Sequence, residues 1–216
     1  MSVRFIYGTG NRAKLEAMRE WLKALDIEII GLSELSGEKE IPDGDESGGS
    51  PLENARIKAE AYYRCFGVPV FSCDSGLYFD NPDFPAELQP GVNVRNVGGK
   101  RLSDEEMTAY YGGLAAKYGR LTARYKNAVC LVLSDGVTIE RMDDSLSGNP
   151  FYIVDKPHGK RAEVSGFPLD CLSVHIPTGK YYYDLTEDDI KASSGLASSM
   201  ADGFAAFFED ILRRFF

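Results

Sequence analysis

Residues 69–77 read PVFSCDSGL, and the rest of the chain is best interpreted outward from them. The apolar run from Val68 to Phe71 predicts a buried strand that stops at Asp74-Ser75-Gly76. A carboxylate and a hydroxyl would then project from the carboxyl end of the strand, where open α/β sheets bind their ligands. Taken alone, this tripeptide is more typical of an Asx turn, so its partners elsewhere in the chain decide its meaning.

The composition is that of an ordinary globular protein, with 216 residues of which 44% are hydrophobic and 26% charged. This length predicts a single domain, residues 1–216, with two lobes. The formal net charge of -9 argues against a nucleic-acid partner, because a polyanion needs a basic surface. A single nucleotide held with a divalent cation stays compatible with that charge.

No apolar run approaches the length that spans a bilayer, and the N-terminus shows no signal-peptide pattern. We therefore expect a cytoplasmic protein without a membrane partner. The chain has four cysteines and no CxxC pair, which predicts reduced packing residues rather than a disulfide framework or a zinc site. Among them Cys73 stands out because it adjoins Asp74.

A phosphate cradle is predicted near the N-terminus. Val3 to Tyr7 is typical of a short strand, residues 8–11 (Gly-Thr-Gly-Asn) of a tight turn, and Ala13 to Leu25 of an amphipathic helix. Lys14 lies in the first turn of that helix, where a cation is useful when an anion binds there too. The spacing is neither that of a P-loop nor GxGxxG, so these motifs do not support it.

A second strand, Ile27 to Gly31, is followed by an acidic, glycine-rich segment that ends at Gly49. Ser50, Pro51 and Glu53 then form a capping-box pattern, which predicts a helix to about Cys65. Glu46 would lie close to this helix start and could reach a metal ion. Lys58 lies two turns into the helix, and the sequence alone favours solvent over the site for its side chain.

The second half of the chain predicts a long ordered loop, residues 81–99, and then a helix from the capping box at Ser103 to about Tyr118, interrupted or weakened at Gly112-Gly113. The remaining expected elements are strands at 122–133, 137–142, 151–154 and 172–176, a hairpin turn at 135–136, and an apolar-faced helix at 194–216. That last helix would pack on the sheet or, in part, on a partner chain.

Three motifs coincide in order and spacing: Thr9-Gly10-Asn11 with Lys14, then Glu46 with Glu53-Asn54-Ala55 and Lys58, then Asp74-Ser75-Gly76-Leu77. Together they resemble the inosine triphosphate pyrophosphatase family, which hydrolyses non-standard purine nucleoside triphosphates such as ITP, dITP and XTP. Residues 90–95, 122–124 and 166–170 are similar to the downstream motifs of that family.

The resemblance implies magnesium-dependent cleavage between the α and β phosphates, which yields a nucleoside monophosphate and pyrophosphate. Its site residues are implied in three sets. Glu46 would bind Mg²⁺, and Asp74 would be a metal ligand or the general base. Thr9, Asn11, Lys14 and Lys58 would hold the phosphates, with Ser75 in support. Phe167 would stack on the purine, with Asp170 nearby in base or sugar recognition.

Two departures from the family pattern are visible. The family has two acidic residues before Ser-Gly-Leu, but the first is Cys73 here, so metal binding would be weaker or would use another residue such as Asp80. The Ser-His-Arg that reads the oxidised purine edge is missing from residues 191–199, and a site loses base discrimination when such groups are removed. Altered or relaxed base recognition is therefore expected.

The predicted architecture is an α/β fold with a long mixed sheet, helices on its faces and two lobes whose cleft holds the site. By resemblance the protein would be a homodimer. Two alternatives to the purine enzyme stay open: a Maf-like pyrophosphatase for other nucleotides, and a catalytically inactive nucleotide-binding protein.

Overall fold

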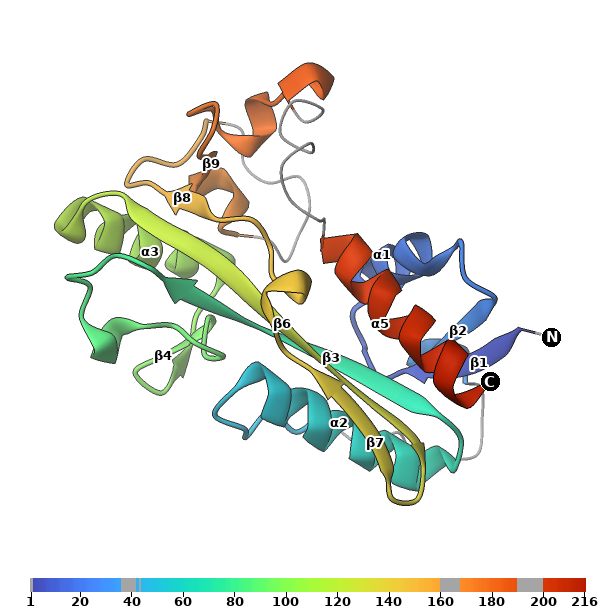
Figure 1. Cartoon of the computed structure of the whole chain (residues 1–216). Coiled ribbons are helices and arrows are strands. Elements are labelled where there is room, and N and C mark those ends of the chain that lie inside the picture. Colours follow the sequence, from blue (N-terminus) through green and yellow to red (C-terminus); the bar gives the residue numbers. More distant parts are fainter. Residues whose placement is uncertain (1, 36–41, 43, 160–167, 190–199) are drawn as a thin grey trace. The chain divides into compact units, whose positions relative to one another are not determined.

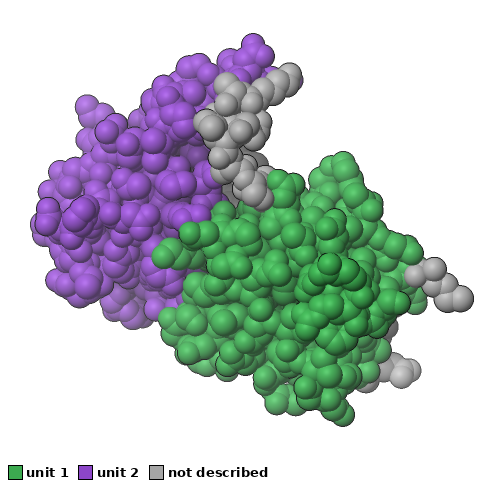
Figure 2. Space-filling view, in the orientation of Figure 1, with its two compact units in different colours: residues 1–75, 126–147, 198–216 green, residues 76–125, 148–197 purple. Residues whose placement is uncertain are grey.

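The computed structural model describes residues 2–35, 42, 44–159, 168–189 and 200–216. Within them seven strands form one mixed sheet, so the predicted α/β class is confirmed (Figure 1). Its order is β2 (Ile27–Gly31), β1 (Val3–Tyr7), β3 (Val70–Phe79), β6 (Leu121–Ser134), β8 (Phe151–Ile153) and β9 (Ser173–His175), with β7 (Val137–Arg141) also paired to β6. The chain divides into two compact units, which are residues 1–75, 126–147 and 198–216 (unit 1) and residues 76–125 and 148–197 (unit 2) (Figure 2).

Unit 1 begins with parallel strands and their crossover helices. Strand β1 pairs in parallel with β2 and with β3, and each parallel pairing requires a crossover. Helix α1 (Arg12–Leu22) leads from β1 to β2, and α2 (Pro51–Phe66) precedes β3. Helix α1 ends three residues before the predicted Leu25, whereas α2 ends one residue after the predicted Cys65.

Strand β3 is longer than the sequence predicts. It runs over 10 residues from Val70 to Phe79, so the expectation that it stops in a turn at Asp74-Ser75-Gly76 is wrong. The backbone stays extended there, and Leu77 donates to the carbonyl of Gly91 across an isolated bridge. Asp74 therefore projects from the middle of a strand, where alternate side chains face opposite sides of the sheet.

The two faces of the unit 1 sheet carry different cores. On one face α1 and α5 (Met200–Phe215) cover a large apolar cluster that includes Phe71, Val129 and Phe208. On the other face α2 packs through Ala55 and Ala59 against alternate residues of β6. The buried apolar side of α5 confirms that the C-terminal helix packs on the sheet.

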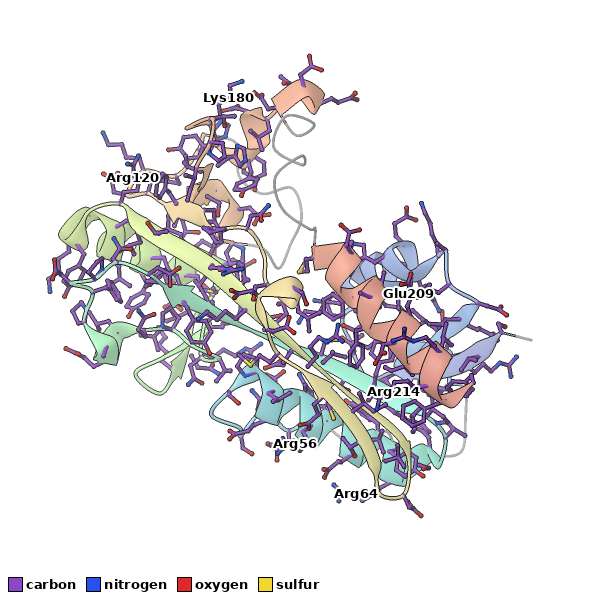
Figure 3. All side chains as sticks on the ribbon, viewed as in Figure 1. Arg56, Arg64, Arg120, Lys180, Glu209 and Arg214 are labelled. Atoms are coloured by element: carbon purple, nitrogen blue, oxygen red, sulfur yellow. The ribbon has the colours of Figure 1, made fainter. Side chains whose placement is uncertain are left out.

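An ion pair attaches α2 to the edge strand β7. The Nε of Arg56 lies 2.5 Å from Oε1 of Glu140 and its Nη2 lies 2.8 Å from Oε2, which is a bidentate arrangement. Figure 3 labels Arg56 beside α2. Helix α2 is thus held both by its alanine face and by a charged contact, so the side chains that it presents to β3 are well positioned.

Unit 2 is built around α3 (Asp104–Tyr118), which lies against β8. The predicted capping box at Ser103 and Glu106 is present. Helix α3 runs without a break, so an interruption at Gly112-Gly113 is wrong. Gly112 serves a close approach instead, because a Cβ there would lie 3.2 Å from the carbonyl oxygen of Asp155. The unit also holds a small hairpin of β4 (Asn96–Val97) and β5 (Lys100–Arg101).

The remaining elements agree with the sequence in type. The hairpin turn at Asp135-Gly136 is present, with Gly136 at φ 79°. Short 3₁₀ turns are η1 (Leu32–Glu34), η2 (Ala86–Leu88), η3 (Asp144–Leu146), η4 (Asp170–Leu172) and η5 (Tyr182–Asp184). In the described ranges no helix combines the length and the apolar character needed to cross a membrane.

Candidate active site

Asp74 lies on the side of β3 that faces α2, and it is almost fully buried, with 7% exposure. Its Oδ1 is 2.8 Å from Nζ of Lys58, and its Oδ2 accepts a hydrogen bond of 3.0 Å from Nδ2 of Asn54. Each carboxylate oxygen thus has one donor from α2. A carboxylate oxygen carries about two acceptor sites, so each can still accept one more donor or contact a metal ion.

Lys58 is buried, so the preference for solvent drawn from the sequence is wrong. Its Nζ contacts Oδ1 of Asp74 at 2.8 Å and Oε1 of Glu46 at 3.2 Å. Burial acts to lower the pKa of Lys58, but the carboxylates of Asp74 and Glu46 outweigh it and leave that pKa raised. Asn54 and Lys58 are four residues apart in α2, which places both on the helix face toward β3.

The acidic loop before α2 is fastened to the first turn of that helix. The backbone N–H of Gly48 donates to Oδ1 of Asn54 at 2.8 Å, and the N–H of Gly49 donates to Oε2 of Glu53 at 2.7 Å. Ser50 caps the helix by accepting from the N–H of Glu53. The predicted capping box is therefore only half formed, because the carboxylate of Glu53 accepts from the N–H of Gly49 rather than from that of the N-cap residue Ser50.

Asn54 is the residue of this cluster whose role sequence reasoning missed. It is 1% exposed and joins the loop backbone to Asp74. Its neighbour Glu53 carries the capping signal, and Asn54 itself has no local signal because both of its partners depend on the tertiary structure. A buried asparagine four residues before a buried lysine becomes informative only when both are known to face one strand.

The turn between β1 and α1 lies against the same side of β3. Gly8 approaches so closely that a Cβ there would lie 2.2 Å from Oγ of Ser72 and 2.5 Å from the ring of Tyr62, so only glycine fits. Ser72 donates to the carbonyl of Gly8 and precedes Asp74 by two residues on that face. The structure thus brings the predicted phosphate cradle next to the Asp74 cluster.

Within this turn, the polar side chains first stabilise the backbone. Oγ1 of Thr9 accepts from the N–H of Asn11 at 3.1 Å, and Oδ1 of Asn11 accepts from the N–H of Lys14 at 3.2 Å. Asn11 is therefore the N-cap of α1, and Lys14 lies half-buried in its first turn. The helix N-terminus and this lysine offer the positive field that an anion needs.

Cys73 faces the opposite side of β3 from Asp74. It belongs to the apolar cluster under α1 and α5, and its thiol hydrogen-bonds with Tyr7. Burial raises the pKa of the Cys73 thiol to about 12. Lys14 and Lys58 lower that pKa and Asp74 raises it, so all three lie within electrostatic range of one thiol. Ser75, half-buried, follows on the Cys73 side by strand alternation.

The oxygen donors near Lys58 fit a divalent cation. In the described parts of the chain no group of three or more His, Cys, Asp or Glu residues is arranged as a metal site. Asp74 and Glu46 nevertheless share one ammonium group, so a more highly charged cation could contact both. Magnesium is commonly held by one or two carboxylates together with water and substrate phosphates, and this pair matches that requirement.

The remaining predicted site residues lie outside this cluster or outside the described residues. Phe167 and residues 191–199 are among those that the structure does not describe. Asp170 and Asp80 belong to unit 2, where Asp170 begins η4 and Asp80 is exposed beyond the end of β3. Burial, and after it the charge of Asp170, raises the pKa of Tyr125 to about 12.

Comparison with known proteins gives a consistent set of similarities. The model of the Ham1 family matches residues 5–189. A dITP/XTP pyrophosphatase from Rhodopseudomonas palustris is 32% identical over 183 residues, which cover 82% of this chain and 78% of that protein. A dITP/XTP pyrophosphatase from Bacillus subtilis is 26% identical over 199 residues, covering 90% of this chain and 92% of that protein.

Solved structures show the same fold. A HAM1 protein from Coxiella burnetii is similar with a TM-score of 0.70 and 23% identity, covering 98% of both chains. The Ham1 protein of Staphylococcus aureus is similar with a TM-score of 0.64 and 21% identity, also over 98% of both chains. At these identities the likeness concerns the fold alone.

Proposed function

The chain belongs to the Ham1 family, and from that premise we propose that it hydrolyses a nucleoside triphosphate to the monophosphate and pyrophosphate. This agrees with the family resemblance drawn from the motifs. Curated relatives are named dITP/XTP pyrophosphatases, which supports a non-standard purine substrate such as ITP, dITP or XTP. The family match gives the Maf-like alternative no support.

The observation that carries the proposal is an ion-pair cluster in which the buried pair of Asp74 and Lys58 meets the exposed carboxylate of Glu46. Two charged side chains buried between α2 and β3 are costly unless they are paired, and replacing such a pair by apolar residues is often neutral or stabilising, so stability alone does not account for it. Attack of water on a triphosphate adds negative charge to phosphoryl oxygens, which needs nearby cations and an acceptor for the proton. This cluster offers both.

We propose that Glu46 and Asp74 hold Mg²⁺ together with the substrate phosphates. When bound, the cation would offset charge on the phosphates and orient them. Asp74 would serve as metal ligand or would accept the proton of the attacking water at one of its carboxylate oxygens. Lys58 would turn its ammonium toward the phosphates while it stays in contact with Asp74.

The β1–α1 turn supplies the second half of the phosphate site in this proposal. Lys14 and the first backbone N–H groups of α1 would bind the phosphates, with Thr9 and Asn11 shaping the turn and Ser75 in support. Phe167 and Asp170 stay predicted contacts of the base and sugar. Because the family's Ser-His-Arg is missing from the sequence, we propose altered or relaxed base preference.

The remaining assignments are also proposals. A homodimer and a cytoplasmic location stay predictions, as do the absence of nucleic-acid and membrane partners and the organisation of residues 1–216 as one domain. The acidic net charge of -9 supports the assignment of a small nucleotide rather than a polynucleotide.

A substrate panel tests the proposal directly. The purified protein is mixed with Mg²⁺ and, in turn, ITP, dITP, XTP and the eight standard triphosphates, and phosphate is measured with and without added inorganic pyrophosphatase. We expect phosphate only when the auxiliary enzyme is present, because the product is pyrophosphate. Phosphate without it, or no product from any nucleotide, would contradict the proposal.

Calorimetry separates the inactive alternative from the enzyme. A nucleotide-binding protein that has lost turnover would bind a triphosphate with Mg²⁺ and leave it intact for hours. The proposed enzyme would instead give a continuous heat of hydrolysis at the same concentrations, with monophosphate recovered from the cell.

A further inference from the structure

We propose that Asn54 is a positioning residue that fixes the Asp74 carboxylate and ties it to the acidic loop carrying Glu46. The inference rests on the function proposed above, since the two residues that it aligns are the proposed metal ligands. Asn54 is not itself placed in contact with substrate.

The orientation of the Asn54 amide is dictated by its two partners. The N–H of Gly48 can only donate, so it selects Oδ1 of the amide, 2.8 Å away. The NH₂ group is thereby directed at Oδ2 of Asp74, at 3.0 Å. In a flipped amide the NH₂ group would face the N–H of Gly48, and the amide oxygen would face the carboxylate of Asp74. Neither pair can form a hydrogen bond, so the network admits a single arrangement.

This arrangement leaves Asp74 little rotational freedom. Asn54 holds one carboxylate oxygen and Lys58 holds the other, at 3.0 and 2.8 Å. Both donors come from α2, which is packed on the sheet through its alanine face. Two donors on two oxygens define the carboxylate plane, and therefore the direction of the free acceptor site on each oxygen.

The other end of the amide positions the loop. Gly48 lies so close that a Cβ there would be 2.7 Å from Oδ1 of Asn54, so glycine is needed for this hydrogen bond. Glu46 stands two residues before Gly48 and contacts the same Lys58 ammonium as Asp74. One buried amide thus sets the relative positions of two carboxylates that lie 28 residues apart in the sequence.

The decisive variant is Asn54→Asp, which keeps the shape and the acceptor for Gly48 but replaces the donor at Asp74 with an oxygen. Loss of such a supporting contact costs about 10- to 100-fold in activity. We expect kcat for pyrophosphate release to fall by about that factor while KM for the nucleotide stays within about threefold. Unchanged kcat, or a change confined to KM, would overturn the proposal.

A matched control is Asn127→Asp. Asn127 is a second buried asparagine of unit 1, and its Nδ2 donates to the carbonyl of Leu146 at 2.7 Å, on β6 rather than in the cluster. The Asn127→Asp variant also gains a buried carboxylate, so it should lose stability in the same way as Asn54→Asp but keep its kcat within about twofold of wild type. An equal loss of kcat in both variants would show that Asn54 is merely structural and would overturn the proposal.

Gly48→Ala tests the contact between the loop and Asn54 without replacing any residue that contacts Asp74. The added methyl group cannot coexist with the Gly48–Asn54 contact, so kcat should fall by about tenfold and the concentration of Mg²⁺ for half-maximal rate should rise. Wild-type values in this variant would overturn the coupling. If the wild-type protein itself releases no pyrophosphate, the proposed function fails, whereas an active wild type with an equally active Asn54→Asp rejects only the role of Asn54.

Discussion

The two sides of β3 in unit 1 differ in what they bury. Toward α2 the strand presents Ser72 and Asp74, and both polar side chains are hydrogen-bonded. Toward α1 and α5 it presents Phe71 and Cys73, which pack among aromatic rings; Phe71 stacks on Tyr7 at 4.5 Å between ring centres. Adjacent residues of one strand therefore serve a polar site and an apolar core.

This difference explains why the departure from the family pattern falls where it does. Cys73, which by resemblance stands where the family has an acid, lies on the apolar side, where burial favours a neutral side chain and raises the pKa of the thiol to about 12. Asp74 lies on the polar side, where Lys58 and Asn54 supply its donors. A thiol is thus tolerated at the first position while the carboxylate is kept at the second.

The largest expected effect comes from Asp74→Asn. We expect pyrophosphate release to fall at least about 1,000-fold, or about 4 kcal/mol of transition-state stabilisation, because both the metal ligand and the proton acceptor are lost. The fold should persist, since the amide keeps the shape of the side chain. Asp83→Asn, at an exposed residue that has no proposed role in the site, is the control and should keep wild-type activity. A normal rate in Asp74→Asn would remove Asp74 from the mechanism.

The next effect comes from Lys58→Met, which leaves Asp74 buried without its cation. We expect a loss of about 3 kcal/mol in the free energy of unfolding, because removing one partner of a buried pair leaves the other charge desolvated and without a compensating cation. Urea unfolding at pH 7 measures it. A loss below about 1 kcal/mol would show that the pair is effectively solvated.

The pH dependence of that difference has a definite sign. The carboxylates raise the pKa of Lys58 above its ordinary value of 10.5, so the ammonium's contribution to the free energy of unfolding is fully present below pH 10.5. It should be lost only as the pH rises through the raised pKa. The free energies of unfolding of the wild type and of Lys58→Met should therefore differ by a constant amount from pH 7 to about 10 and become equal at higher pH. Convergence already at pH 8 would contradict the raised pKa.

A smaller effect is expected on the apolar side. Cys73→Asp, which introduces an acid where the family has one, should cost about 2 kcal/mol in stability because it buries a carboxylate among aromatic rings. It should leave the Mg²⁺ concentration for half-maximal rate within about twofold, since position 73 faces away from Asp74. Cys73→Ala controls for the loss of the thiol. A tenfold tighter Mg²⁺ requirement in Cys73→Asp would show that both sides of the strand serve the metal.

The smallest effect is expected when the native protein is treated with a thiol reagent, because Cys73 should hardly react. Only the thiolate reacts with a disulfide reagent, so Cys73, with its pKa raised to about 12, should stay unmodified for hours at pH 8. Cys65 is the least buried of the four cysteines and should react first. Peptide mapping after labelling checks both, and rapid labelling of Cys73 would contradict its place in the core.

Much of the fold could be predicted because its signals are local. Ser50 followed by Pro51 predicts the start of α2, and Asp135-Gly136 predicts the hairpin between β6 and β7. Errors arose where a neighbour outside the local segment decides the outcome. Strand β3 continues through Ser75 and Gly76 because it pairs with β6 in the sheet and Leu77 pairs with Gly91, which no local pattern reveals.

The candidate site likewise has features that local sequence predicts and features that depend on the tertiary structure. The sequence by itself determined which chemical groups are present, in which order, and hence the family, because the motifs are short and their spacing survives divergence. Only the tertiary structure decided that Lys58 turns inward, that Asn54 joins Gly48 to Asp74, and that Cys73 and Asp74 face opposite sides. The contacts of Lys58 and Asn54 with Asp74 join residues 16 and 20 positions apart that meet only when α2 packs on β3. The opposite facing of Cys73 and Asp74 follows because β3 continues past both residues.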